Sequence, residues 1–205
     1  PESRIVVALP GTTQGARTKR KSETPAILSI GSIIPRKGHD VLIAALAQIS
    51  DLTWRCNIIG NRTMDAVYDS ALQRQIRQNR LTDRITLAGQ VNDTRSEFVR
   101  SDIFALASRY EGYGMVFAEA LSHGLPIVAC RAGAIPEVVP EDAGILVPPD
   151  DPIAFAQALR RLIENEPLAD RMADASFHHG RTLPQWSDTA LLFSAALDKA
   201  TNERF

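Results

Sequence analysis

The sequence predicts an α/β protein built on a doubly wound, mostly parallel sheet of about six strands. Two observations lead to this prediction. Short apolar runs of four to six residues recur along the chain from Ala26 onwards, and sequence with helical periodicity separates most of them. Strands that read as continuous apolar runs are typical of parallel sheets covered by helices on both faces. With 205 residues, 44% of them hydrophobic, the chain is long enough for one well-buried domain.

The first half of the chain starts with an irregular region and then alternates strands and helices. Residues 5–9 form a short strand candidate, and the stretch that follows is polar up to Pro25. Beyond it, the expected strands end at or near a glycine, and the two longer helices carry apolar residues three or four positions apart. We expect these strands at 26–31, 55–59 and 85–88, and helices at 39–49, 65–78 and 95–100.

The second half of the chain continues this alternation. An apolar run at 103–107 is the fourth expected strand, and helical sequence begins at about Met115 and ends before Gly124 and Pro126. Pro152 is well placed as the first residue of a later helix, because proline fits the first helical position. The remaining elements are strands at 127–130 and 144–147, a turn at 133–137, and two helices at about 167–177 and 185–199.

Composition argues against nucleic-acid or membrane partners for this chain. The formal net charge is −1, so no global field favours a polyanion, and an anion site has to be built locally. The one basic cluster lies in a polar stretch and is interpreted as a solvated linker; it consists of Arg17, Lys19, Arg20 and Lys21. No run approaches 18 apolar residues and no signal peptide is visible, so we expect a cytoplasmic protein.

The cysteines and histidines indicate neither a disulfide nor a metal centre. Cys56 and Cys130 lie inside apolar runs that read as strands, which favours buried free thiols and a reducing compartment. The four histidines lack the spacing of metal ligands. We therefore predict no structural metal.

A strand, a glycine-rich turn and a helix meet at residues 108–121, and the candidate site is built around them. Such a turn leaves backbone N–H groups unpaired at the helix N-terminus, where they and the helix dipole can bind a phosphate. Glu111 lies just before this helix and Glu119 about one turn inside it. A diphosphate that joins two polyhydroxylated rings would use both the amides and the carboxylates. Taken singly, Glu111 could be a solvated loop residue and Glu119 a first-turn acid favoured by the dipole.

The two glutamates are separated by seven residues, with Gly-Tyr-Gly after the first and Ala-Leu-Ser-His-Gly-Leu-Pro after the second. This pattern resembles the donor-binding motif of the retaining glycosyltransferases of group 1 (family 4), which have the two-domain GT-B fold. The resemblance covers residues 26–159, with five segments in the expected order. It implies a nucleoside-diphosphate sugar, such as a UDP- or GDP-sugar, as substrate and no further cofactor.

The resemblance assigns roles to residues by their place in the motif. Glu111 would orient the transferred sugar and Glu119 the ribose hydroxyls, while the amides of residues 114–116 would stabilise the leaving diphosphate. Glu111 and Lys37 form the expected catalytic group. The turn residues expected to bind the substrate are Glu111, Gly112, Tyr113, Gly114, Met115, Val116 and Glu119.

The loop after the first strand supplies the other expected phosphate contacts. In the resembled family this loop begins with Gly-Arg and ends with Lys-Gly, and both basic residues hold the diphosphate. Gly31 and Lys37 match this pattern, whereas Ser32 stands where the arginine is expected. Arg36, or Arg62 in the next loop, could supply the missing charge, and Arg36 is included with Ser32 among the expected substrate-binding residues.

Three further segments resemble the family less closely. Residues 87–91 resemble a Leu-Gly-x-Val segment whose backbone meets the base, which places Val91 at the base. Residues 133–137 resemble a Gly-Gly-x-Pro-Glu turn and are interpreted as structural. Residues 60–62 lack the usual Gly-x-Gly-Pro, so the contact of that loop with a ligand stays open.

The resemblance also implies a domain organisation. Residues 1–25 would be an interdomain linker and the end of a missing N-terminal domain, residues 26–180 the nucleotide-sugar-binding domain, and residues 181–205 a C-terminal helix. Acceptor recognition in this family lies mostly in the N-terminal domain. The acceptor, and any membrane contact, would therefore reach this chain through the missing domain.

Two other functions are open alternatives. A related GT-B enzyme, such as a nucleotide-sugar epimerase or a phosphorylase, would share the architecture, although no lysine segment for pyridoxal phosphate is visible and the order of motifs differs from the epimerases. A non-catalytic nucleotide-binding or scaffold domain would keep the fold without turnover. Ser32 in place of the arginine is the only feature that favours the scaffold.

Overall fold

The computed structural model describes residues 5–17 and 24–202, in which six parallel strands form one sheet in the order β3-β2-β1-β4-β5-β6. This order starts in the middle of the sheet and builds outwards in both directions, which defines a doubly wound, Rossmann-like sheet. The strands are β1 (Ala26–Ile30), β2 (Arg55–Ile59), β3 (Ile85–Gly89), β4 (Ile103–Leu106), β5 (Ile127–Cys130) and β6 (Gly144–Val147). The predicted fold class is confirmed, and these strands agree with the predicted ones within one residue.

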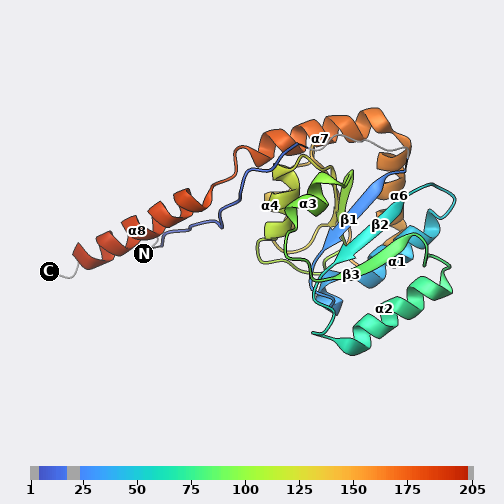
Figure 1. The fold of residues 1–205 in the computed structure, drawn as a ribbon. Helices are drawn as coiled ribbons and strands as arrows, with labels where there is room; N and C mark the ends of the chain where they lie inside the picture. The colour runs from blue at the N-terminus through green and yellow to red at the C-terminus, as the bar shows by residue number, and fades with distance from the viewer. Residues whose placement is uncertain (1–4, 18–23, 203–205) are drawn as a thin grey trace.

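Helices cover both faces of the sheet. Helices α1, α2 and α6 lie on one side and α3 and α4 on the other (Figure 1). Helix α1 packs against α2 and α6, and α4 packs against α7. The bounds are η2 (Pro35–Lys37, a 3-10 helix), α1 (His39–Gln48), α2 (Ala66–Gln78), α3 (Arg95–Val99), α4 (Met115–Ser122), α5 (Ile135–Val138), α6 (Pro152–Glu164), α7 (Glu166–Gly180) and α8 (Trp186–Asn202).

Local sequence explains where several helices begin. The Asp65 carboxylate accepts a hydrogen bond from the amide of Tyr68 at the start of α2, and Asp151 caps α6 in the same way. Pro152 follows Asp151 as the first residue of α6, as predicted. Each cap satisfies amides that have no partner inside the helix.

Helix α4, which carries the second glutamate of the motif, is fixed firmly over the centre of the sheet. Its Phe117 meets Phe104 of β4 edge to face, with ring centroids 5.6 Å apart, and both rings are fully buried. Such a pair contributes about 0.5–1.5 kcal/mol beyond the area it buries. This contact holds the first turn of α4 against β4.

The loops after the strands meet at one edge of the sheet, because all six strands are parallel. The amide of Gly31 donates to the carbonyl of Ile59 (2.9 Å), and the amide of Gly60 donates to that of Gly89 (3.0 Å). The loop after β4 joins them, since the Arg109 amide donates to the carbonyl of Arg36 (2.8 Å). This confirms the expectation that the strand-end glycines and the motif turn share one edge.

Two expected elements differ from the structure. Residues 5–9 do not form a strand: within residues 5–17 and 24–202 no strand pairs with them, and they run next to α8, where the Thr189 hydroxyl donates to the carbonyl of Leu9 (2.7 Å). The turn at 133–137 contains the short helix α5, started by a proline in its first turn. Cys56 and Cys130 are buried and free, as predicted. Of the basic cluster, Lys19, Arg20 and Lys21 lie outside the described residues.

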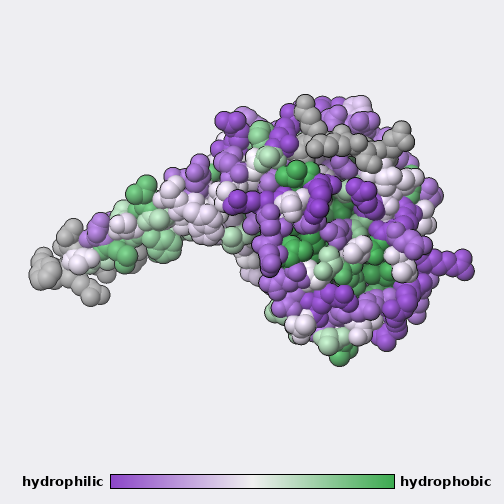
Figure 2. All heavy atoms as spheres, in the orientation of Figure 1, coloured by the Kyte–Doolittle hydropathy of each residue, from purple (hydrophilic) through white to green (hydrophobic). Residues whose placement is uncertain are grey.

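Helix α8 projects from the globular body together with the N-terminal segment (Figure 1), and apolar side chains are exposed along it (Figure 2). Among the residues that the structure describes, no helix combines the length and apolarity needed to cross a membrane. The exposed side chains on these two segments include Ile5, Val7, Leu191, Phe193 and Leu197, each more than half exposed.

Candidate functional site

Lys37 and Glu111 form a close ion pair at the carboxyl edge of the sheet. Lys37 Nζ lies 2.6 Å from Glu111 Oε1, and the two side chains are only 14% and 7% exposed. Charges shielded in this way attract each other more strongly than charges on the surface. The structure thus brings together the two residues predicted to be catalytic, although their roles stay predictions.

The Glu111 carboxylate and backbone are held from several sides. The Ser108 hydroxyl donates to the same Oε1 atom (2.7 Å). Behind the loop, the amide of Ala134 donates to the carbonyl of Glu111 (3.0 Å). Gly133 has a φ of 56°, and a Cβ there would lie 2.2 Å from that carbonyl oxygen, so no larger residue fits. The turn interpreted from sequence as structural therefore positions the backbone of Glu111.

The loop that carries Lys37 is shaped by η2 and by the glycine that follows it. Gly38 has a φ of 65°, and a Cβ there would lie 1.9 Å from the carbonyl oxygen of Ala107. The next residue, His39, is buried, and its Nε2 lies 3.2 Å from the carbonyl oxygen of Gly31. Burial lowers the pKa of His39 to about 4, so this ring is neutral at pH 7 and supports the loop without adding charge.

The structure distinguishes between the two residues that could supply the second positive charge for a diphosphate. Arg62 is engaged by Asp69, with Nε and Nη2 at 2.7 and 3.0 Å from the two carboxylate oxygens. The Arg36 side chain is 47% exposed, and its Nη1 donates to the carbonyl of Tyr110 (3.0 Å) and lies 3.5 Å from Glu111 Oε2. Arg36 is therefore beside the ion pair and free to reach a ligand, whereas Arg62 is held elsewhere.

Helix α4 begins next to the ion pair. Its N-cap residue, Gly114, is left-handed with a φ of 84° and has no side chain that could cap the first turn. Of the first-turn amides, that of Phe117 donates to the carbonyl of Gly114 (2.9 Å), whereas those of Met115 and Val116 have no partner inside the helix and need a ligand or water. Gly112 is exposed, and a Cβ there would meet no atom within 4 Å. The neighbouring Tyr113 is half-buried, and burial raises its pKa.

Glu119 lies one turn further along α4, in a pocket of about 140 Å³. The pocket is also lined by Thr13 of the N-terminal segment, by Thr94 and Arg95 before and in α3, and by Met115. Pockets for whole drug-sized ligands measure roughly 300–1,000 Å³, so this pocket would hold only part of a larger molecule. Burial raises the pKa of the Glu119 carboxyl.

We expect Glu119→Gln to raise the melting temperature at pH 7. Burial raises the folded-state pKa of Glu119 above the ordinary value of 4.5. Protonation of this carboxyl therefore stabilises the folded protein fully below pH 4.5, and this stabilisation is lost as the pH rises through the folded-state pKa. At pH 7 the ionised carboxylate opposes folding, and a neutral glutamine removes this effect. Calorimetry should show a gain of about 1–2 °C that shrinks near pH 4. An equal gain at both pH values would contradict this cause.

Val91 lies in the loop after β3 and is half-buried against the core. The end of this loop supplies Thr94, which lines the Glu119 pocket. Gly31 lies under the Lys37 side chain, whose Cδ would be 3.2 Å from a Cβ at that position. Predicted residues thus lie in two groups, with Lys37, Arg36 and Glu111 at the ion pair and Met115 and Glu119 at the pocket, whereas Val91 is not among the residues that line this pocket.

A larger cavity of about 300 Å³ lies at the opposite edge of the sheet. Pro25 and Pro126, which line it, directly precede β1 and β5. Ligands of doubly wound sheets bind at the carboxyl ends of the strands, and an acidic lining disfavours a phosphate. The acidic side chains of this cavity are Asp102, Glu166, Asp170 and Asp174, against the single Arg17.

Comparison with known families identifies the chain. The family model for "Glycosyl transferases group 1" matches residues 24–165, which include both groups of site residues. The chain belongs to the group 1 glycosyl transferases. It is 26% identical to the D-inositol 3-phosphate glycosyltransferase of Corynebacterium glutamicum, over 98% of this chain and 50% of that protein.

Solved structures agree with this assignment. The chain superposes on Anabaena HepE, solved in complex with UDP and glucose, with a TM-score of 0.81 at 23% identity, over 86% of this chain and 49% of that one. It superposes on the C-terminal domain of LpcC, a group 1 glycosyl transferase family protein of Francisella tularensis, with a TM-score of 0.72 at 25% identity, over 82% of this chain and 94% of that one. The chain spans about half the length of the curated relatives it matches. The predicted identity as the C-terminal domain of a GT-B glycosyltransferase is confirmed.

Sequence reasoning missed two residues that this group 1 domain uses to build the site. Ser108 lies two residues after the end of β4 and donates to Glu111, and its place three residues before the glutamate was a usable signal. Arg109 gave no such signal, because its partners are far away in the sequence. The domain boundaries after residues 25 and 180 stay predictions.

Proposed function

We propose that this chain is the donor-binding half of a retaining glycosyltransferase that transfers a sugar from a nucleoside diphosphate to an acceptor hydroxyl. One observation carries the proposal: a shielded lysine–glutamate pair lies against the first turn of α4, and a second glutamate lies in a pocket one turn further along. The diphosphate would occupy the first group and the ribose the second. HepE, which shares the fold, was solved with UDP and glucose.

Each group has a task in the proposed reaction. The bond between the anomeric carbon and the diphosphate oxygen breaks, and the acceptor oxygen forms a new bond to that carbon and passes its proton to the departing diphosphate. Negative charge grows on the diphosphate, where Lys37 and the amides of Gly114, Met115 and Val116 stabilise it. Glu111 orients the sugar and Glu119 the ribose, while Val91 meets the base.

Arg36 supplies the second cation of the diphosphate site in this proposal. Ser32 occupies the position where the family has an arginine, and Ser32 carries no charge. The half-exposed Arg36 guanidinium is already beside the ion pair. A donor phosphate at Lys37 would therefore be within reach of two cations, as in the resembled family, although the second cation comes from the end of the loop.

The acceptor site belongs, in this proposal, to a second domain. The chain spans about half the length of its curated relatives, and α8 projects from the body with apolar side chains exposed, those of Leu191, Phe193 and Leu197 among them (Figure 2). We propose that these side chains and the N-terminal segment pack against that domain. The isolated chain should accordingly bind donor nucleotide and transfer sugar poorly or not at all. The two buried thiols fit a cytoplasmic location.

Calorimetric titration of the chain with UDP, GDP and ADP tests the proposal. Binding of one nucleotide supports a donor site and identifies its base. Absence of binding for all three would favour the scaffold alternative. Efficient sugar transfer by the isolated chain would contradict the need for a second domain. Enzymatic epimerisation of a nucleotide sugar would favour the related GT-B alternative.

A further inference from the structure

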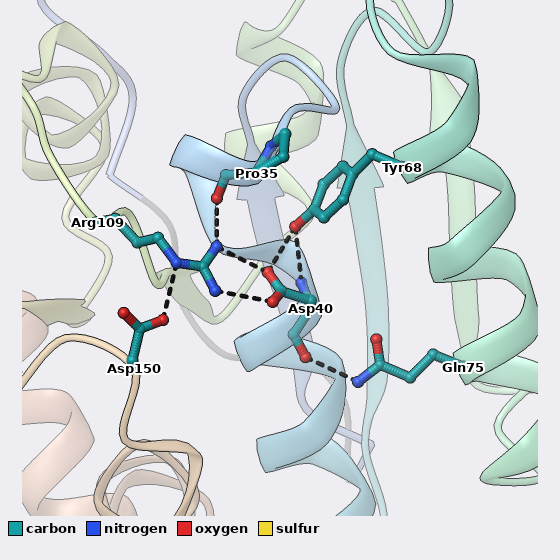
Figure 3. A network of polar contacts seen from close by, with 6 residues as sticks. All are labelled: Pro35, Asp40, Tyr68, Gln75, Arg109 and Asp150. Atoms are coloured by element: carbon teal, nitrogen blue, oxygen red, sulfur yellow. Dashed lines mark hydrogen bonds and ion pairs between the residues drawn. The ribbon is translucent and has the colours of Figure 1, made fainter.

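Arg109 lies two residues before Glu111, and its side chain enters a polar network of its own (Figure 3). Its Nη1 and Nη2 atoms donate to the two carboxylate oxygens of Asp40, at 3.0 and 2.8 Å. Its Nε donates to Asp150 Oδ1 (2.8 Å), and Nη1 also donates to the carbonyl of Pro35. A planar guanidinium can satisfy all of these partners at once, whereas a lysine offers a single point charge.

The partners of Arg109 belong to different loops at the site. Pro35 is in η2, Asp40 is in the first turn of α1, and Asp150 follows β6. The backbone adds one more link between these loops, because the Arg109 amide donates to the carbonyl of Arg36 (2.8 Å). The loop that carries Lys37 is therefore tied to the loop that carries Glu111 at several points outside the ion pair.

Asp40 is itself anchored from α2. The Tyr68 hydroxyl donates to Asp40 Oδ1 (2.6 Å) and accepts from the Asp40 amide (3.1 Å), and Gln75 donates to the Asp40 carbonyl (2.9 Å). Burial opposes ionisation of Asp40, but the hydrogen bonds from Arg109 and Tyr68 outweigh it and hold its pKa below the ordinary value. Asp150 keeps a left-handed φ of 57° where it meets Arg109, a strain that persists only where surrounding contacts hold it.

The Lys37–Glu111 ion pair cannot both hold the two loops together and open to contact the donor. Lys37 and Glu111 neutralise each other in the ligand-free site, and a donor that contacts both must separate them. If the ion pair alone held the loops together, opening it would let the distance between the Lys37 loop and the Glu111 loop change. A tie that lies outside the path of the ligand removes this conflict.

We propose that Arg109 is a positioning residue that fixes the spacing of the Lys37 and Glu111 loops, so that the ion pair can open for a diphosphate without loss of loop geometry. This inference rests on the proposed function for its ligand. Arg109 itself does not contact the ligand in this account. It acts through the position of Lys37.

A double-mutant cycle with UDP as the probe tests this role. Arg109→Gln and Arg109→Lys should each weaken UDP binding about tenfold, because neither keeps the forked contact to Asp40. In a Lys37→Met background, Arg109→Gln should cause no further loss. Arg160→Gln is the matched control, since Arg160 also bridges two carboxylates, those of Asp51 and Glu164, from α6, and it should bind UDP like the wild type. Equal losses in both backgrounds, or wild-type affinity of Arg109→Lys, would overturn the proposal.

Hydrogen exchange separates this inference from the proposed function. Without any ligand, Arg109→Gln should speed amide exchange in peptides that cover residues 31–38 and 107–114, and Arg160→Gln should not. Unchanged exchange in these peptides would overturn the positioning role even if UDP binds. Faster exchange with no UDP binding by the wild type would leave the loop tie standing and refute the donor site instead.

Discussion

Replacing Lys37 by methionine is expected to weaken UDP binding about 10–150-fold, which corresponds to the roughly 1.5–3 kcal/mol of a charge-assisted hydrogen bond. Lys37 is the cation closest to Glu111 and is only 14% exposed, so its charge acts in a partly dry site. Methionine keeps most of the length and apolar contact of the side chain and removes only the charge. Isothermal titration calorimetry of the folded variant measures this loss.

The same substitution should also lower the stability of the ligand-free protein. It leaves the Glu111 carboxylate, 7% exposed, without its closest cation, and breaking a buried pair costs about 3–5 kcal/mol. We expect the lower end of this range, because Arg36 lies 3.5 Å from the other carboxylate oxygen and can partly compensate. Titrations therefore belong well below the melting temperature of the variant.

Lys199→Met is the matched control, because Lys199 is exposed near the end of α8. It should change neither UDP affinity nor the free energy of unfolding by more than about 0.5 kcal/mol. If Lys37→Met bound UDP as tightly as this control, Lys37 would not be a phosphate ligand. Its pairing with Glu111 would then be structural.

The sheet could be predicted from sequence because its signal is local. Strands β4 and β5 are buried along their whole length and read as uninterrupted apolar runs, so their position needed no knowledge of neighbours. Residues 5–9 read equally well as a strand, yet they lack a strand to pair with. An apolar segment is expected to be buried, whereas its pairing with another strand depends on the tertiary structure.

Only those site residues that belong to a motif with characteristic spacing could be predicted from the sequence. The two glutamates and Lys37 followed from motif spacing, and the structure brings Lys37 to Glu111 across 74 positions. The network of Arg109 gave no sequence signal, because Asp40 and Asp150 lie 69 and 41 positions away and look like ordinary surface acids. The choice between Arg36 and Arg62 likewise needed the structure, since only geometry shows that Asp69 already holds Arg62.

Replacing Glu111 by glutamine should separate the binding of the diphosphate from the binding of the sugar. In the ligand-free site the carboxylate accepts from both Lys37 and Ser108, and it competes with any phosphate for the ammonium group. Glutamine has the same shape and no charge. We therefore expect UDP to bind about fivefold more tightly to the variant, equivalent to roughly 1 kcal/mol of relieved repulsion and competition.

The ratio of the affinity for UDP-glucose to the affinity for UDP should be lower in Glu111→Gln than in the wild type. If Glu111 orients the sugar, the additional binding that the glucosyl group provides in the wild type should fall or vanish in Glu111→Gln, because a charged acceptor binds hydroxyls more strongly than a neutral amide. Parallel titrations with UDP and UDP-glucose measure this difference directly. Equal changes for both ligands would remove Glu111 from the sugar site. The ion pair would then act only as an internal counter-charge for Lys37, opened by the diphosphate alone.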